Sequence, residues 1–421
     1  MMKNILFCLL FDDFKTSFPI SWVGRIMAIV TAIAVCMLVS GFLYMIPDKR
    51  YFYYFACAAS LIYICVKGNI RLNYYMVFFY VVILLNVSVL PINPMFRSQE
   101  RALFFVFITL VCSPAITSIS ALAYRERVFK YTLVGLSVLS LLSFFCFFLG
   151  VNMMPFNREG SEALYDDYAN VGGKFSGLFT HSMIFGPVSA IVSLVHFNLY
   201  LKYSKTSRLI LFFLCFMSCV FSASRAALFG LGLGFLFVIF KAVRSPNSYI
   251  SSKKIGRLVV FVSLAVLPLV SVAFSGLLNK IAVTQDEFGG YNSREIKYKS
   301  RLTEFEKAPI LGVGFASIDV STGDAYNPSN GQIEPGTSHL AVLAQTGVLG
   351  MIAYCMLLCG ALKNIRKNSS LYAFSACSLF WFFFGHGWGE GWIFAPGGMI
   401  CFLFWLSVAQ CYDLGFRRGV S

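Results

Sequence analysis

Residues 208–242 read RLILFFLCFMSCVFSASRAALFGLGLGFLFVIFKA, two apolar runs that are separated by a single arginine, Arg225. Each run is close to the length that a helix needs to cross a hydrocarbon core about 30 Å thick. Similar apolar runs recur from one end of the chain to the other. The pattern indicates a helical protein that crosses a membrane many times.

The composition of the 421-residue chain excludes an ordinary soluble protein. Hydrophobic residues make up 58% of it and charged residues only 13%, whereas a soluble domain carries about 25% charged residues. The net charge of +15 does not indicate a nucleic-acid partner, because Lys and Arg form short clusters between the apolar runs instead of one basic stripe or tail. The lipid bilayer is therefore the expected surrounding of this protein.

We predict an all-α, polytopic membrane protein with residues 1–421 in a single transmembrane domain. Lys and Arg gather in the loops on one side of the predicted spans, so the positive-inside rule places the N- and C-termini in the cytoplasm. Arg125 and Arg208 belong to these predicted cytoplasmic loops. The twelve predicted spans are approximately 22–46, 51–66, 73–91, 102–122, 130–151, 183–201, 208–222, 226–242, 257–277, 340–362, 371–386 and 395–412.

Two polar loops lie on the opposite, non-cytoplasmic side of the predicted spans. The loop at 152–182 includes Lys174 and His181, and the loop at 278–339, between the ninth and tenth spans, is the longest polar segment of the chain. Loops of this length are uncommon unless they bind something. We therefore expect the binding surface of the protein on this side.

The longer loop contains the pattern of a helix. Asn292 is a favourable N-cap, and Glu295 follows it at the spacing that lets the carboxylate reach back. The helix is expected to run to Ala308 and to stop at Pro309. Four of its residues share one face at spacings of three and four: Arg294, Tyr298, Arg301 and Phe305.

Arg225 is the most informative single residue, because a guanidinium between two apolar runs is costly and usually functional. The alternative interpretation is an interfacial arginine whose side chain extends to the membrane surface. Arg225 is predicted on the non-cytoplasmic side, where arginine is disfavoured. The planar guanidinium matches phosphate oxygens, so a phosphate is its expected partner.

Three of the four histidines, His181, His339 and His386, are predicted at the non-cytoplasmic ends of spans. The spacing of histidines and cysteines in this sequence is not that of a metal site, and no bound metal is expected. Residues 385–392, GHGWGEGW, are too rich in glycine for a helix and are predicted to form a loop. Trp388 in this loop either stacks on a sugar ring or belongs to the aromatic belt at the membrane interface.

Five short patterns follow one another between residues 174 and 406. They are Lys174–Phe179 with His181 and Gly186; Ser222–Arg225; Ser293-Arg294 ahead of Pro309 and Leu311–Gly314; Ser338–Gly350; and Glu390 with Pro396-Gly397 and Phe404–Leu406. In this order, with a long loop before the tenth span, they resemble the superfamily of O-antigen ligases and O-antigen polymerases, glycosyltransferases of the bacterial envelope. Over the first five spans the likeness is one of hydropathy alone.

The resemblance implies a fold similar to the GT-C class of membrane glycosyltransferases and a location in the bacterial inner membrane. It implies that a glycan moves from undecaprenyl diphosphate to an acceptor hydroxyl at the periplasmic face, without a cofactor or a metal. Arg225 and Arg294 would neutralise the departing diphosphate, and His339, with Glu390 as the second candidate, would orient or deprotonate the acceptor. A chain-length regulator protein is a further expected partner. Additional substrate contacts are expected from Arg301, Lys174, His181 and Trp388.

One position departs from the family pattern. Gly336 stands where the family usually has a histidine, and His339 lies about one helical turn further along. This departure favours a polymerase, which joins lipid-linked repeat units, over the alternative ligase, which transfers the finished glycan to lipid A core. A transporter or flippase is a third hypothesis, disfavoured because the predicted span centres carry little charge and no internal repeat is evident.

Overall fold

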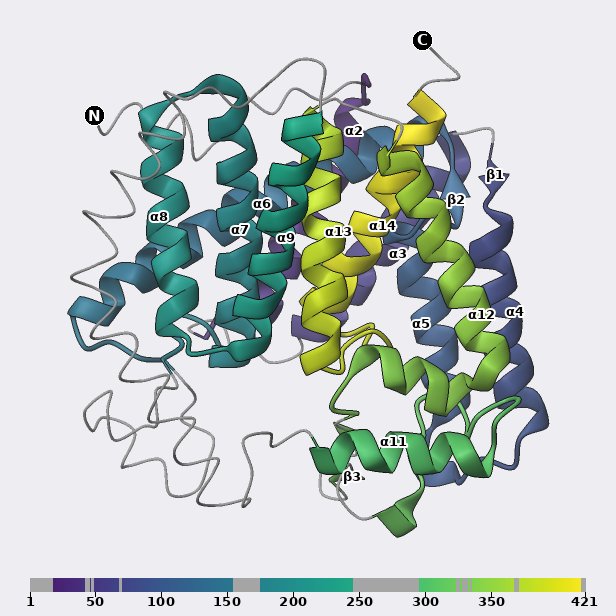
Figure 1. The fold of residues 1–421 in the computed structure, drawn as a ribbon. Helices are drawn as coiled ribbons and strands as arrows, with labels where there is room; N and C mark the ends of the chain where they lie inside the picture. The colour runs from purple at the N-terminus through teal and green to yellow at the C-terminus, as the bar shows by residue number, and fades with distance from the viewer. Residues whose placement is uncertain are drawn as a thin grey trace.

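The computed structural model describes residues 18–41, 46, 49–67, 70–153, 175–244, 295–322, 326–327, 332–333, 335–366 and 371–417. This part of the chain is mostly helical (Figure 1). The helices are α2 (Trp22–Val39), α3 (Lys49–Lys67), α4 (Tyr74–Val89), α5 (Ser98–Cys112), α6 (Ile119–Phe148), α7 (Ser182–Tyr203), α8 (Thr206–Phe221), α9 (Arg225–Arg244), α11 (Glu295–Lys307), α12 (Ser338–Arg366), α13 (Leu371–Gly389) and α14 (Met399–Arg417), with the short 3-10 helices η2 (Pro94–Phe96) and η4 (Val320–Thr322). Two antiparallel pairs of two-residue strands complete the list: β1 (Arg71–Leu72) with β2 (Ile116–Thr117), and β3 (Tyr326–Asn327) with β4 (Gln332–Ile333).

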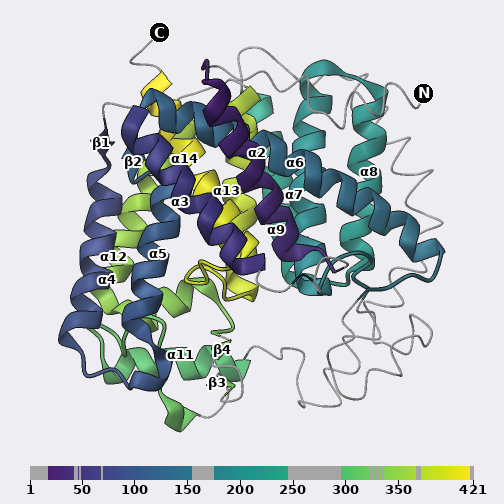
Figure 2. The same cartoon turned by 180° about the vertical axis from the view of Figure 1, so that it is seen from behind.

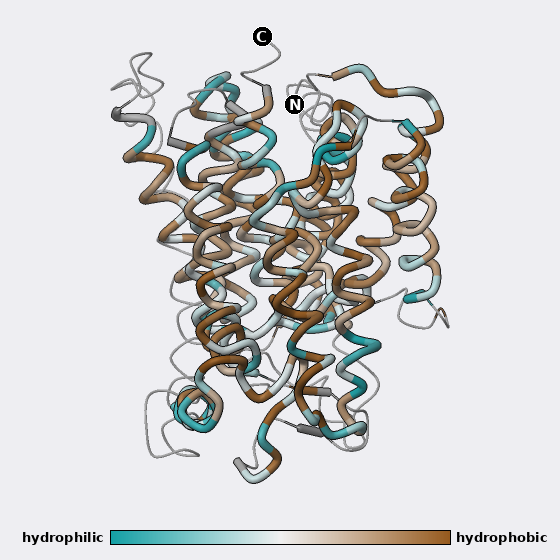
Figure 3. The backbone as a smooth tube through the Cα atoms, turned by 90° about the vertical axis from the view of Figure 1, so that its right-hand side faces the viewer, coloured by the Kyte–Doolittle hydropathy of each residue, from teal (hydrophilic) through white to brown (hydrophobic). Residues whose placement is uncertain are grey.

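Eleven of the twelve predicted spans contain a helix, and the remaining one, 257–277, lies outside the described residues. By length and composition, five of the described helices can cross a membrane, namely α2, α6, α7, α12 and α14, and α4 and α8 are shorter apolar helices. Apolar residues run through the middle of the bundle, whereas polar residues are more frequent toward its ends (Figure 3). The protein is therefore an integral membrane protein.

The helices pack as a bundle in which α9 and α13 join two groups. Helix α7 is almost completely buried and packs against α6, α8, α9 and α13. Helix α12 packs against α4, α11, α13 and α14, and α2, α3 and α6 cover the opposite face (Figure 2). Helix α11 lies across the ends of α12 and α13 (Figure 1).

The predicted span at 102–122 is wrong, because these residues form the end of α5 and the start of α6. Helix α5 ends at Cys112, and Pro114, which lacks a backbone N–H donor, follows two residues later. Helix α6 then begins at Ile119, well before the predicted position 130.

Arg125, which was expected in a cytoplasmic loop, is therefore buried inside α6. Its Nε and Nη2 donate to the two carboxylate oxygens of Asp413 on α14, at 3.1 and 2.5 Å. Its Nη1 donates to the carbonyl oxygens of Ser113 and Ile116, at 3.3 and 2.9 Å. The guanidinium can be buried because a carboxylate and the carbonyls near the end of α5 satisfy it.

The glycine-rich stretch predicted to be a loop is helical through Gly389, so that prediction is wrong for residues 385–389. Gly385 and Gly389, one turn apart on α13, face Gly230 and Ala226, one turn apart on α9. Small residues at this spacing let two helices approach closely, and the packing outweighs the low helix propensity of glycine.

Candidate active site

Four segments meet at one end of the bundle: the start of α9, the end of α13, the start of α12, and α11. The Tyr298 hydroxyl on α11 donates to the carbonyl oxygen of Trp388 at 2.6 Å. The Ser338 hydroxyl at the start of α12 donates to the carbonyl oxygen of Glu390 at 2.7 Å. Together with the contact of Ala226 on Gly389, these bonds bring four sequence-predicted regions into one place.

Arg225 is the first residue of α9 and is half-buried. The turn before it is tight: Ala223 has a φ of 48°, and the Ser224 hydroxyl accepts from the N–H of Ala227 at 3.4 Å. Gly186 of α7 leaves room for this turn, because a side chain there would meet Ser222 and Ser224. Arg225 is thus the first residue of a helix whose N-terminal N–H groups attract negative charge, as its guanidinium does.

His181 is the N-cap residue of α7. Its Nδ1 accepts from the backbone N–H of Met183 at 3.0 Å, so the imidazole caps the helix. This contact fixes the tautomer and leaves Nε2 as the atom that carries the proton. Because Gly186, in the first turns of the same helix, contacts Ser222 and Ser224, His181 lies at the same end of the bundle as Arg225.

His339 is 6% exposed, and both of its ring nitrogens are engaged. A carbonyl oxygen can only accept, so Nε2 donates to Phe384 O at 2.9 Å, and Nδ1 accepts from the Tyr354 hydroxyl at 3.2 Å. The Trp388 ring, 42% exposed, lies 5.0 Å from the imidazole. In this arrangement His339 supports Trp388, and its use as a base requires that Tyr354 release Nδ1.

Gly336 adopts a φ of 74°, which is a left-handed conformation that favours glycine. A side chain at this position would meet the side chain of Lys297 on α11. The backbone and packing at position 336 thus disfavour the histidine that the family usually has there.

Helix α12 breaks at Gly347, whose φ of 64° and ψ of −165° are not helical. The break exposes backbone groups that bond to the segment after α11: Val348 N–H donates to the Pro309 carbonyl at 2.8 Å. Asn86 of α4 bonds to both of these segments, because its Nδ2 donates to the carbonyls of Leu311, after α11, and of Gln345 in α12. The third and fourth sequence patterns are therefore two halves of one docking motif that attaches α11 to the bundle.

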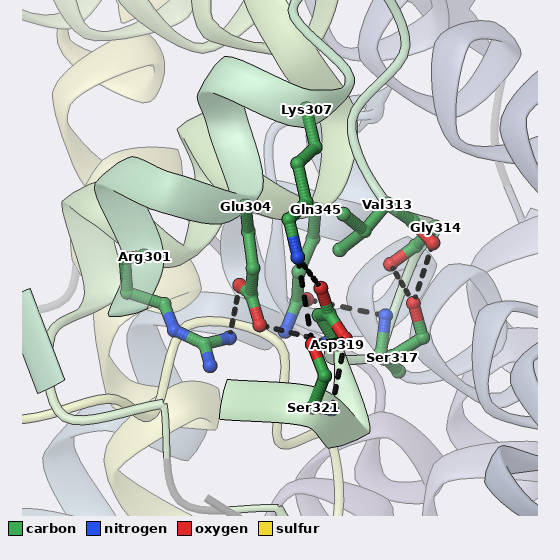
Figure 4. A network of polar contacts seen from close by, with 10 residues as sticks. Arg301, Glu304, Lys307, Val313, Gly314, Ser317, Asp319, Ser321 and Gln345 are labelled. Atoms are coloured by element: carbon green, nitrogen blue, oxygen red, sulfur yellow. Dashed lines mark hydrogen bonds and ion pairs between the residues drawn. The ribbon is translucent and has the colours of Figure 1, made fainter. Parts of the chain in front are cut away.

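Helix α11 confirms the predicted helix from residue 295 onward, and Tyr298, Arg301 and Phe305 lie on its inner side. Arg301 is buried and forms an ion pair with Glu304, Nη1 to Oε2, at 2.7 Å. Glu304 Oε1 accepts from the N–H of Asp319 at 2.9 Å, and Lys307 forms an ion pair with the Asp319 carboxylate (Figure 4). Arg301 therefore belongs to a polar network between α11 and the segment that follows it.

The carboxylates of this network have opposite pKa shifts. Burial raises the pKa of Glu304 to about 7, although the neighbouring Arg301 lowers it. Hydrogen bonds from Lys307 and Ser321 lower the pKa of Asp319 to about 2. Sequence reasoning missed Glu304, and the signal available was its place one turn after Arg301 on the predicted inner face.

Two further predicted residues, Lys174 and Arg294, lie outside the described residues. In the described part of the chain, no group of three or more His, Cys, Asp or Glu side chains is placed to hold a metal ion. Sequence reasoning also missed Asn86. It missed two arginines as well, Arg50 and Arg101, and these two line a cavity beside the start of α12.

Fold and site together define a membrane-embedded protein in which the residues of the candidate site gather at the end of the helical bundle that carries α11. Residues 210–355 match the model of a family described as O-antigen ligase. The matched range includes Arg225, α11 and the break at Gly347. The match covers 146 of the 421 residues and supports the superfamily that the five sequence patterns resemble, with a function of the O-antigen ligase or polymerase type. No curated protein matches the chain.

Proposed function

We propose that this protein is a polymerase of undecaprenyl-diphosphate-linked oligosaccharide repeat units, such as those of O-antigen, capsule or exopolysaccharide. It acts at the periplasmic face of the bacterial inner membrane, with both termini in the cytoplasm. The growing glycan moves from one carrier lipid to a hydroxyl of the repeat unit on a second carrier.

In this reaction the acceptor hydroxyl oxygen attacks the anomeric carbon of the donor sugar. The new glycosidic bond forms while the bond from that carbon to the diphosphate oxygen breaks, and undecaprenyl diphosphate leaves with the electron pair. Arg225, at the positive end of α9, and Arg294 stabilise the charge that develops on the diphosphate. The acceptor proton passes to a base of the protein.

Glu390 and His339 are the two candidates for this base. Glu390 follows Gly389, the last residue of α13, which contacts Ala226 at the start of α9, and its carbonyl oxygen accepts from the Ser338 hydroxyl. His339 has both ring nitrogens bonded within the protein. We assign proton acceptance to Glu390 and the positioning of Trp388 against the glycan to His339.

The observation that carries the choice of a polymerase is Gly336. Its left-handed backbone and the Lys297 side chain beside it disfavour a histidine at this place, to which the ligase branch is the more strictly tied. His339, one turn further along, points into the protein instead. This supports an acceptor chemistry different from that of the ligase.

Deletion of the gene tests the proposal against the ligase alternative. Loss of a polymerase leaves single repeat units on the surface lipid, because a separate ligase still transfers them. Loss of a ligase leaves a bare core while long chains accumulate on the carrier. Electrophoresis of the surface glycan and mass spectrometry of the carrier lipids distinguish the two, and a bare core with long carrier-linked chains would refute the polymerase.

A further inference from the structure

A cavity of about 340 Å³ lies beside the candidate active site, and the described residues that line it do not include Arg225, His339 or Glu390. Its walls come from the starts of α3, α5 and α12 and from residues 391–397, which connect α13 to α14. Two arginines, Arg50 and Arg101, and two aromatic rings, Tyr54 and Phe104, line it on the side of α3 and α5.

The cavity and the candidate active site share a wall. Gly391 lines the cavity and packs against Pro335, while the preceding Glu390 is bonded through its carbonyl to Ser338. On the other side of Glu390, Gly389 contacts Ala226, the residue that follows Arg225. The segment that carries Glu390 therefore connects the cavity wall to the start of α9.

The lining suits an anionic ligand with sugar rings. No Asp or Glu is among the described residues that line the cavity. The Tyr54 and Phe104 rings, 5.1 Å apart, form an apolar wall next to the arginines. Guanidinium groups bind phosphate oxygens, and aromatic faces pack against the apolar faces of sugars.

The neighbouring surface suits a lipid. Phe55 of α3 is 70% exposed and Leu103 of α5 is 64% exposed, each within a few residues of a cavity arginine. In an integral membrane protein such side chains face hydrocarbon. A phosphate bound by Arg50 and Arg101 can therefore carry a chain that stays in the bilayer.

We infer that this cavity is the acceptor pocket: Arg50 and Arg101 bind the diphosphate of a second lipid-linked saccharide, and Tyr54 and Phe104 contact its sugars. The inference rests on the proposed function, which requires two lipid-linked glycans at once. It places the acceptor hydroxyl next to Glu390 and opposite the donor diphosphate at Arg225.

The test uses the purified full-length protein in lipid nanodiscs with two substrates that have separate roles. The donor is an undecaprenyl-diphosphate-linked repeat unit whose acceptor hydroxyl is removed, and the acceptor is a fluorescent, neutral, lipid-linked repeat unit. The variant R50Q/R101Q should raise the KM for the acceptor about tenfold or more, with the KM for the donor unchanged. The control R97Q, from the same end of α5 but outside the cavity, should leave both unchanged.

Each outcome decides one question. Elongation of the lipid-linked repeat unit by the wild type tests the proposed polymerase function. If the wild type elongates only lipid A core, the polymerase function is refuted. The role of the cavity is then tested by the effect of R50Q/R101Q on the KM for lipid A core. An acceptor KM that R50Q/R101Q leaves unchanged overturns the inference. An effect seen only with an acidic sugar overturns the assignment to the lipid diphosphate. Because R50Q/R101Q can misfold, A341L, which fills the cavity from α12, provides a second variant with the same expected rise.

Discussion

Arg225 combines three features that favour a phosphate ligand. It begins a helix, it is half-buried next to a left-handed turn, and it lies where α7, α9 and α13 meet. A lysine keeps the charge but loses the planar fork. The neighbouring serines cap the helix, so the position of the guanidinium is set by the backbone.

Replacing Arg225 with Ala should lower turnover about a hundredfold or more, because the developing diphosphate charge loses its guanidinium. Arg225→Lys should recover part of this loss. The measurement is polymer formation by the purified protein, with Lys202→Ala, at the far end of α7, as the control. Full polymer from Arg225→Ala at normal expression would refute the assignment.

His339 should behave as a positioning residue. His339→Ala should lower kcat about tenfold through Trp388, while the pH profile of kcat/KM stays that of the wild type. Tyr354→Phe, which removes only the hydroxyl bonded to Nδ1, should give a smaller loss with the same profile. If His339→Ala instead removes a limb of the pH profile, the histidine is the base and Glu390 is not.

At the scale of the elements, the attachment of α11 to the bundle depends on the break in α12. Gly347 alone allows the backbone of α12 to turn out toward residues 309–312. Gly347→Ala should destabilise the protein by about 1–3 kcal/mol from backbone strain, plus the clash of its Cβ with the Ile310 carbonyl. Thermal unfolding and limited proteolysis of α11 measure the effect.

Gly232 offers the matched control for Gly347. It lies in α9 with open space around its Cα, so Gly232→Ala should be neutral or stabilising by up to about 1 kcal/mol. Equal losses from both variants would mean that the docking of residues 309–312 is not what Gly347 provides.

The stability of α11 should also depend on pH through Glu304. Its folded pKa of about 7 lies above its ordinary value of 4.5, so the folded state binds more protons between these values. The contribution of Glu304 to stability is therefore largest below about pH 4.5 and falls as the pH rises to 7. Glu304→Gln should remove this slope, as measured by hydrogen exchange of α11 from pH 5 to 7, and a slope that persists in the variant would contradict the assignment.

At the scale of the whole molecule, the pair of Arg125 and Asp413 joins α6 to the last helix, α14. Asp413→Ala leaves a buried guanidinium without its carboxylate and should cost about 3–5 kcal/mol. The double variant Arg125→Met/Asp413→Leu should recover most of this loss. Thermal unfolding tests both, and because the pair lies far from the start of α12, the KM values of the folded fraction should not change. An Asp413→Ala protein as stable as the wild type would contradict this role.

The sequence determined the class of the protein, because apolar runs of membrane-spanning length leave no soluble alternative. It also predicted Arg225, His181, Tyr298 and Glu390 on one side of the membrane, since the positions of spans and loops follow from hydropathy. These features are local along the chain, and a sequence pattern can report them.

Tertiary structure decided the features that depend on contacts between distant residues. The helix at Gly385–Gly389 exists because α9 packs against it, and Arg125 is buried because Asp413 arrives from the other end of the chain. The bonded state of His339 depends on Phe384 and Tyr354, and the cavity forms where α3, α5 and α12 come together. Helix propensity and charge act within a few residues, whereas burial, close packing and the pairing of charges are set only when the bundle has assembled.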